Sequence, residues 1–257
     1  MKYDNLNQFK DSFSNYTELR VQENRNNRVN LINGDVTGNV AARTSGVSAR
    51  VFKDGNWGFS SSPDINQDSI SSVVKASTEN VQFMNKKDTT RCGFFLPETQ
   101  GNYEIDFTTK KDRQTQKYWV DFIREIDGYI EQKYPELLSR NLIMGGLDME
   151  KSLFTSDGSE SYSMTPRALL YVMLSIEKDG SPISIGNPWG GLGQLEDKFR
   201  QPSDYYTEID TLIEKLKQKA DGVYANAGCK DVVLDADLAG ILAHEAIGHT
   251  TEADLVM

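Results

Sequence analysis

The fold is decided by residues 142–185, which read LIMGGLDMEKSLFTSDGSESYSMTPRALLYVMLSIEKDGSPISI. Short apolar runs in this stretch are separated by Ser156-Asp157-Gly158 and by Lys178-Asp179-Gly180. Glycine adopts positive φ without steric cost, so these sequences are typical of tight turns between strands. They predict an antiparallel meander. The strands are expected at 142–145, 150–155, 160–164, 169–177 and 182–185.

The amino-terminal part predicts more strands of the same kind. We expect strands at about 16–23 and 29–32, the second of them closed by the turn sequence Asn33-Gly34. A hairpin follows, in which 46–52 and 57–60 flank the loop 53–56. Trp57 and Phe59 alternate with small residues and are predicted to lie in the core.

Apolar residues at helical spacing predict amphipathic helices that pack on this sheet. The first covers about 68–83, the second carries the apolar residues from Trp119 to Ile130 and stops before Pro135, and the third runs from Pro202 to the closing pair Asp221-Gly222. A short strand at 232–234 should lead through a cap at Asp235 or Asp237 into a last helix. The glycine-rich segment 186–193 is expected to be a loop, and it matches no phosphate-binding signature.

The predicted fold class is therefore α+β, a mixed and largely antiparallel sheet packed with amphipathic helices and followed by a motif-bearing helix. We expect an α+β amino-terminal domain at 1–198 and a helical segment at 199–257.

Composition excludes several functions. The net charge of −10 argues against a phosphate-tracking surface, so no nucleic acid is expected as a partner. The longest apolar run, 168–176, is far shorter than the roughly 20 residues of a membrane span, so no membrane partner is expected either. The amino terminus lacks the apolar core of a signal peptide, which predicts a cytoplasmic location. Cys92 and Cys229 are isolated and expected to be reduced.

The only two histidines of the chain lie together in Leu238-Ala-Gly-Ile-Leu-Ala-His244-Glu245-Ala-Ile-Gly248-His249. Neutral imidazole is a common ligand of transition metals, and a carboxylate beside a bound metal can accept a proton from water. In a regular α-helix, however, a five-residue step turns the second ring by about 140° from the first. A π-bulge would bring both rings to one ion, and Gly248 is where we expect the backbone to distort most easily. The alternative is that His244 and His249 are two unrelated helix residues.

The same segment resembles the His-Glu-x-x-x-His segment of the TldD/PmbA proteins, also called modulator of DNA gyrase. The likeness covers 238–256 and includes Glu252 and Asp254. Near the amino terminus, Glu18-Leu-Arg20-Val, Asn33-Gly34-Asp35 and the run from Gly46 to Phe59 are similar to the first strands and hairpin of that family.

The resemblance implies a zinc-dependent peptidase that acts on unfolded or extended peptides and works as a homodimer, or as a heterodimer with a family relative. His244 and His249 would hold zinc, and Glu245 would be the catalytic base. It also implies a β-rich carboxy-terminal domain, absent from these 257 residues, that supplies a cysteine as the third protein ligand.

Other interpretations stay open. Cys229 could in principle be the third ligand, although a small residue entering a strand is the more common role of a free cysteine. Glu252 and Asp254 are local candidates for the third ligand or else exposed acids. The chain could also be a non-catalytic subunit or interaction module of such a dimer. A regulator of topoisomerase action on DNA is a third class, which the acidic charge opposes.

Overall fold

The computed structural model describes residues 5–87 and 100–252. The described strands are β1 (Tyr16–Ile32), β2 (Asp35–Lys53), β3 (Asn56–Ser62), β4 (Asn102–Asp106), β5 (Ser139–Thr155), β6 (Glu160–Lys178) and β7 (Ser181–Leu192). The described α-helices are α1 (Gln67–Lys87), α2 (Gln116–Lys133), α3 (Leu195–Lys198), α4 (Tyr206–Ala220) and α5 (Ala236–Ala243). Short helical turns are η1 (Leu6–Ser12), η2 (Pro202–Tyr205), η3 (His244–Gly248) and η4 (His249–Thr251).

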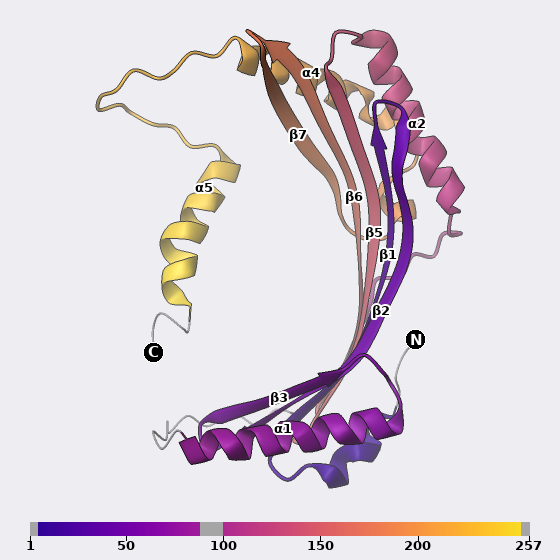
Figure 1. The fold of residues 1–257 in the computed structure, drawn as a ribbon, viewed down its shortest axis with the longest axis vertical. Helices are drawn as coiled ribbons and strands as arrows, with labels where there is room; N and C mark the ends of the chain where they lie inside the picture. Colours follow the sequence, from indigo (N-terminus) through magenta and orange to yellow (C-terminus); the bar gives the residue numbers. More distant parts are fainter. Residues whose placement is uncertain (1–4, 88–99, 253–257) are drawn as a thin grey trace. The chain divides into compact units, whose positions relative to one another are not determined.

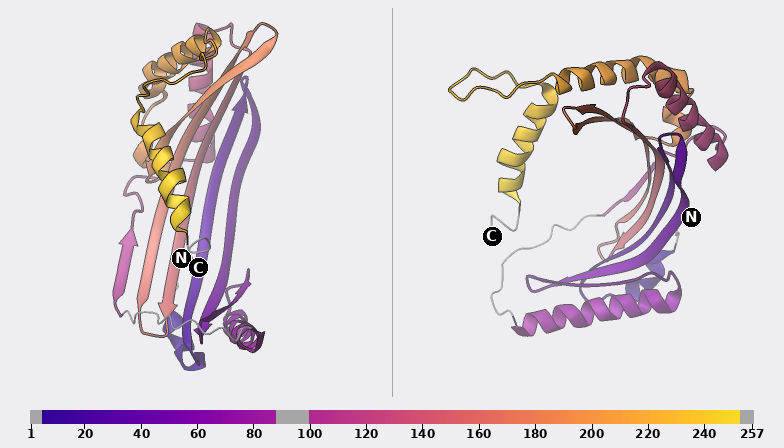
Figure 2. Two further views of the ribbon diagram at one scale, coloured as in Figure 1. Left: turned by 90° about the vertical axis from the view of Figure 1, so that its left-hand side faces the viewer. Right: turned by 45° about the horizontal axis from the view of Figure 1, so that its top comes forward.

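The described strands form one sheet in the order β3-β2-β1-β5-β6, and both β4 and β7 pair with β6. All pairs are antiparallel except β4 with β6, so the sheet is mixed and largely antiparallel as predicted. The long strands β1, β2, β5 and β6 curve together along their length (Figures 1 and 2). Helix α1 lies at one end of these strands, and α2 and α4 lie at the other (Figure 1).

The predicted hairpin turns are confirmed by their backbone angles. Asn33-Gly34, Asp54-Gly55 and Asp179-Gly180 each place two successive residues at positive φ, between 48° and 89°. This is the type I′ geometry, whose twist matches that of the flanking antiparallel strands.

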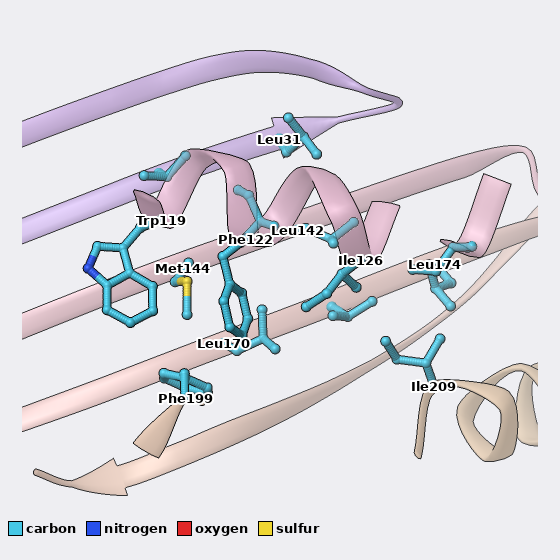
Figure 3. Close-up of a cluster of buried hydrophobic side chains, with 14 of the residues drawn as sticks. Leu31, Trp119, Phe122, Ile126, Leu142, Met144, Leu170, Leu174, Phe199 and Ile209 are labelled. Atoms are coloured by element: carbon cyan, nitrogen blue, oxygen red, sulfur yellow. The ribbon is translucent and has the colours of Figure 1, made fainter. Parts of the chain in front are cut away.

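The larger hydrophobic core lies between the sheet and helices α2 and α4 (Figure 3). Helix α2 is capped by the Thr115 hydroxyl, which accepts from the Tyr118 N–H at 3.2 Å, and it ends before Pro135 as predicted. Its buried face meets strand residues such as Leu142 and Leu170 (Figure 3). Helix α4 adds four buried side chains, Ile209, Leu212, Ile213 and Leu216. Each buried Leu or Ile contributes about 1.5–3 kcal/mol relative to exposure, so α4 is firmly part of this core.

The smaller core lies under α1 and η1 at the other end of the strands. Ile70, Val73 and Val74 of α1 pack there on Leu19 and Val47, which confirms the predicted apolar face of this helix. The prediction that Trp57 and Phe59 lie in the core is wrong, because their side chains are 38% and 59% exposed. They occupy edge strand β3, where Trp57 packs beside Phe52 and under the Arg50 guanidinium.

Charged residues separate the two cores in the middle of the sheet. Arg25 donates from Nη1 to Glu23 and to Glu150, each at 2.6 Å, and Arg43 also donates to Glu23. Burial raises the pKa of the Glu23 carboxyl, but the hydrogen bonds from Arg25 and Arg43 outweigh burial and hold that pKa below its usual value. Asp148 accepts from the Gln194 side chain at 3.1 Å in the same region. We call these residues the polar band: Glu23, Arg25, Arg43, Asp148, Glu150 and Gln194.

Several predicted strands prove to be parts of longer ones. The segments 16–23 and 29–32 belong to β1, 142–145 and 150–155 to β5, and 160–164 and 169–177 to β6. The expected loop 186–193 is also mostly strand, because β7 continues to Leu192. Gly190 permits this pairing: a Cβ there would stand 2.0 Å from the Ala168 carbonyl oxygen. The strand expected at 232–234 does not form.

The chain consists of two compact units, residues 1–221 and 222–257. The first unit thus extends past the boundary expected after Lys198, because α4 is buried in its core. That residues 199–257 begin a carboxy-terminal domain stays a prediction. Across residues 5–87 and 100–252, no helix has the length and apolar character that a bilayer span needs.

Asp210 joins α4 to the carboxy-terminal end of α2 through hydrogen bonds from three side chains. Tyr129 and Tyr134 each donate a hydroxyl to it at 2.8 Å, and Lys133 donates from Nζ at 2.7 Å. Partial burial raises the pKa of the Asp210 carboxyl, but these bonds from Lys133, Tyr134 and Tyr129 lower it more, so the folded pKa lies below the usual value. A carboxyl of this kind stabilises the fold above its unfolded pKa, and the contribution is lost as pH falls through its folded pKa.

Asp210→Ala should therefore lower the free energy of unfolding by about 1–3 kcal/mol at pH 7, the usual range for hydrogen bonds to a charged group. The difference from the unchanged protein should shrink below about pH 4. Urea unfolding followed by circular dichroism at pH 7 and at pH 3 measures both values. An equal difference at the two pH values would contradict a role for the ionised carboxylate.

Candidate metal centre

Helix α5 in residues 222–257 begins at a side-chain cap. The Asp235 carboxylate accepts from the Leu238 N–H at 2.9 Å, which selects Asp235 over Asp237 as the cap. Asp237 lies in the first turn, where a negative charge interacts favourably with the helix dipole. A defined helix start fixes which direction each later side chain takes, including those of the two histidines.

The helix changes at His244 from α-helical to π-helical geometry. The turn η3 spans His244–Gly248, and the His249 N–H donates to the His244 carbonyl oxygen five residues earlier. This confirms the π-bulge that the spacing of the histidines predicts. The additional residue between the histidines is absorbed in one wide turn.

The wide turn brings the two imidazole rings together. Their centroids are 4.5 Å apart and their planes meet at 81°. One ligand atom from each of His244, Glu245 and His249 lies within 4.8 Å of the others. Two imidazoles and a carboxylate form a donor set that suits zinc and related transition metals. The two histidines therefore fit a metal ion, with Glu245 next to them.

Hydroxyl groups satisfy the carbonyls at the end of the wide turn. Thr250 Oγ1 donates to Ala246 and Ile247, and Thr251 Oγ1 donates to Ile247 and Gly248, at 2.9–3.2 Å. Carbonyls at a helix end have no partner within the helix, so such bonds stabilise the irregular turn. Sequence reasoning did not find this role, although two adjacent threonines directly after the motif were visible.

Gly248 does not act as expected. Its φ of −58° and ψ of −56° are ordinary helical values, so the backbone does not need glycine to distort here. A Cβ on residue 248 would meet His244 Nδ1 at 3.8 Å, an ordinary contact. An alanine at this position would therefore fit beside the His244 ring.

Two carboxylates flank the His249 ring. Glu252 Oε1 lies 2.5 Å from Nδ1, and Glu245 Oε2 lies 3.8 Å from Nε2. The His249 and Glu245 side chains are 47% and 63% exposed. Cys229 is exposed, does not lie in a strand and is not one of the three clustered residues. Cys92 and Asp254 lie outside the described residues.

Solved structures of three proteins share this fold. TldE from Thermococcus kodakarensis matches with a TM-score of 0.59 and 14% identity, over 84% of this chain and 46% of that one. A putative modulator of DNA gyrase from Bacteroides thetaiotaomicron matches with a TM-score of 0.59 and 13% identity, over 82% of this chain and 48% of that one. A putative modulator of a DNA gyrase from Thermotoga maritima matches with a TM-score of 0.57 and 15% identity, over 73% of this chain and 41% of that one. The α+β architecture is common to all of them.

Residues 17–81 match a family model described as PmbA/TldA metallopeptidase domain 1. Proteins named metalloproteases from Methanocaldococcus jannaschii and Methanothermobacter thermautotrophicus are 22% and 23% identical, each over 94% of this chain. A protein from Saccharolobus solfataricus named a zinc metalloprotease TldD homolog is 20% identical over 82% of the chain. The matched regions span 52%, 51% and 45% of these relatives, so the chain covers about half of their length. Through the family model at residues 17–81 and through these relatives, the chain is similar to the TldD/PmbA family.

Proposed function

We propose that the chain is part of a zinc-dependent peptidase of the TldD/PmbA type that hydrolyses unfolded or extended peptides. The observation that carries this proposal is the π-helical turn, which sets the rings of His244 and His249 4.5 Å apart with Glu245 beside them. The names of the archaeal relatives, among them a zinc metalloprotease, support it.

His244 and His249 would hold the ion through ring nitrogens. A zinc ion held there supplies Lewis-acid chemistry, which makes water more acidic and polarises a peptide carbonyl. Glu245 accepts the proton of the attacking water at a carboxylate oxygen and passes it to the nitrogen of the leaving amine. The position of Glu245 Oε2, 3.8 Å from His249 Nε2, keeps this carboxylate beside the ligand nitrogens.

A catalytic zinc site generally has three protein ligands and one open position. The described cluster offers two histidines and a carboxylate that we assign to proton transfer. We therefore propose that a third ligand comes from a carboxy-terminal domain of a longer chain. By family resemblance, we further propose that the working form is a homodimer or a heterodimer with a relative.

The first prediction concerns metal content. The complete protein should carry about one zinc per chain, and His244→Ala or His249→Ala should each remove most of it, because two ligands remain where three are needed. Elemental analysis of purified protein measures this. Asp231→Ala, which removes a charge upstream of α5, is the control and should retain zinc. Full zinc in both histidine variants would refute the site and favour a non-catalytic subunit.

The second prediction tests the wide turn. Deleting Ile247 leaves His-Glu-x-x-His, a spacing that puts both rings on one face of a regular α-helix, so zinc binding should persist. Inserting one alanine after Ile247 separates the histidines by six positions and should abolish zinc binding. A zinc-chelator competition compares the two variants. Loss of binding in the deletion variant and retention in the insertion variant would contradict our account of the turn.

The third prediction separates metal binding from catalysis. Glu245→Gln should keep its zinc but cleave an unstructured peptide about 10²–10⁴ times more slowly, because the amide cannot accept the proton. Cleavage and zinc content are measured on the same preparation, with Asp231→Asn as the charge-matched control. Equal activity of Glu245→Gln and the unchanged protein would remove Glu245 as the base.

A further inference from the structure

We propose that Glu252 is a positioning residue that holds the His249 imidazole in one tautomer, with the proton on Nδ1 and the lone pair of Nε2 free for a metal ion. The proposal rests on the proposed function for the identity of the metal, but the tautomer itself is a property of the metal-free chain.

The contact between Glu252 and His249 defines the proton position. Glu252 Oε1 lies 2.5 Å from His249 Nδ1, close enough for a hydrogen bond. An ionised carboxylate has no proton to donate, so Nδ1 must donate. In a neutral ring the other nitrogen, Nε2, then carries the lone pair. The hydrogen bond therefore selects the nitrogen that binds metal.

The local backbone explains why Glu252 can reach Nδ1. After the wide turn, the chain tightens into η4, and the Glu252 N–H donates to the His249 carbonyl oxygen at 3.3 Å. Glu252 itself leaves the helix with φ −66° and ψ 140°. The Thr250 and Thr251 hydroxyls bond carbonyl oxygens of the preceding wide turn, those of Ala246 and Gly248. The carboxylate is thus directed back to the ring three residues before it.

The same geometry argues against Glu252 as the third metal ligand. Glu245 Oε2 lies 3.8 Å from His249 Nε2, whereas Glu252 is bonded at Nδ1. The two ring nitrogens of an imidazole point in different directions, so a carboxylate on Nδ1 would orient the ring rather than share an ion held at Nε2. This distinguishes Glu252 from Glu245, which lies on the Nε2 side.

Nitrogen NMR of the metal-free chain tests this proposal directly. With only two histidines in the chain, imidazole ¹⁵N signals can be assigned by comparison with the His244→Ala variant. At a pH where the ring is neutral, His249 should show a protonated Nδ1 and an unprotonated Nε2. In Glu252→Ala the ring should shift toward protonated Nε2, whereas Asp231→Ala should leave it unchanged.

A protonated Nε2 on His249 in the unchanged chain would overturn the proposal. An unchanged tautomer in Glu252→Ala, with the same helix content by circular dichroism, would overturn it as well. If Glu252 were a metal ligand, its loss would weaken zinc binding without changing the tautomer of the metal-free ring.

Zinc affinity gives a second readout. Glu252→Ala should bind Zn²⁺ about 10–100 times more weakly in a chelator competition on the complete protein, the usual effect of losing a group that orients a ligand. If the proposed metal site were wrong but the tautomer proposal right, the results would differ. Glu252→Ala would still change the His249 tautomer, but the His244→Ala and His249→Ala variants would keep their full zinc content.

Discussion

Hydrogen-bonded pairing carries β1, β5 and β6 without interruption past the polar band, which neither hydrophobic core includes. Arg25 of β1 lies opposite Asp148 of β5, and Asp148 lies opposite Pro166 of β6. A charged residue in a strand interior is tolerated when it has charged partners within reach, as Arg25 has in Glu150 on the neighbouring strand β5 and in Glu23 on its own strand. The continuous strands thereby join two cores that would otherwise be separate small domains, and one sheet supports both α1 and the α2–α4 pair.

The same band explains where sequence reasoning about the fold succeeded and where it failed. Turns such as Asn33-Gly34 and Asp179-Gly180 were predictable because their chemistry is local, and the apolar faces of α1, α2 and α4 were predictable from their spacing. Strand continuity was not, because segments such as 24–28 lack apolar alternation and are held by ion pairs with residues far away in the sequence. The prediction that Trp57 and Phe59 lie in the core failed for a related reason. Alternation of large and small side chains indicates one face of a strand, but it does not show whether another element covers that face.

At the candidate metal centre, the spacing of the histidines along a helix predicted the backbone geometry better than the residue types did. Five positions place two side chains out of phase in an α-helix, so a shared site required the π-turn that the structure has at His244–Gly248. The prediction that Gly248 permits this turn was wrong, because Gly248 keeps ordinary helical angles. The hydroxyls of Thr250 and Thr251 instead bond the carbonyls that the turn leaves without helical partners. A glycine can be recognised in the sequence as a residue with a flexible backbone. The carbonyl that a threonine hydroxyl reaches cannot be predicted in the same way, because it depends on the geometry of the folded turn.

In the roles proposed above, two glutamates seven positions apart differ because they meet opposite nitrogens of one imidazole. Glu252 lies 2.5 Å from Nδ1, where it would hold the proton, and Glu245 lies 3.8 Å from Nε2, close to this ring nitrogen but without a short hydrogen bond to it. A base must exchange its proton during each turnover, whereas an orienting group must not, so the longer contact suits the first task and the shorter contact the second. On this proposal, the wide turn before His249 and the extended backbone at Glu252 place the two carboxylates at different nitrogens of one ring, and this difference in place gives them different chemistry.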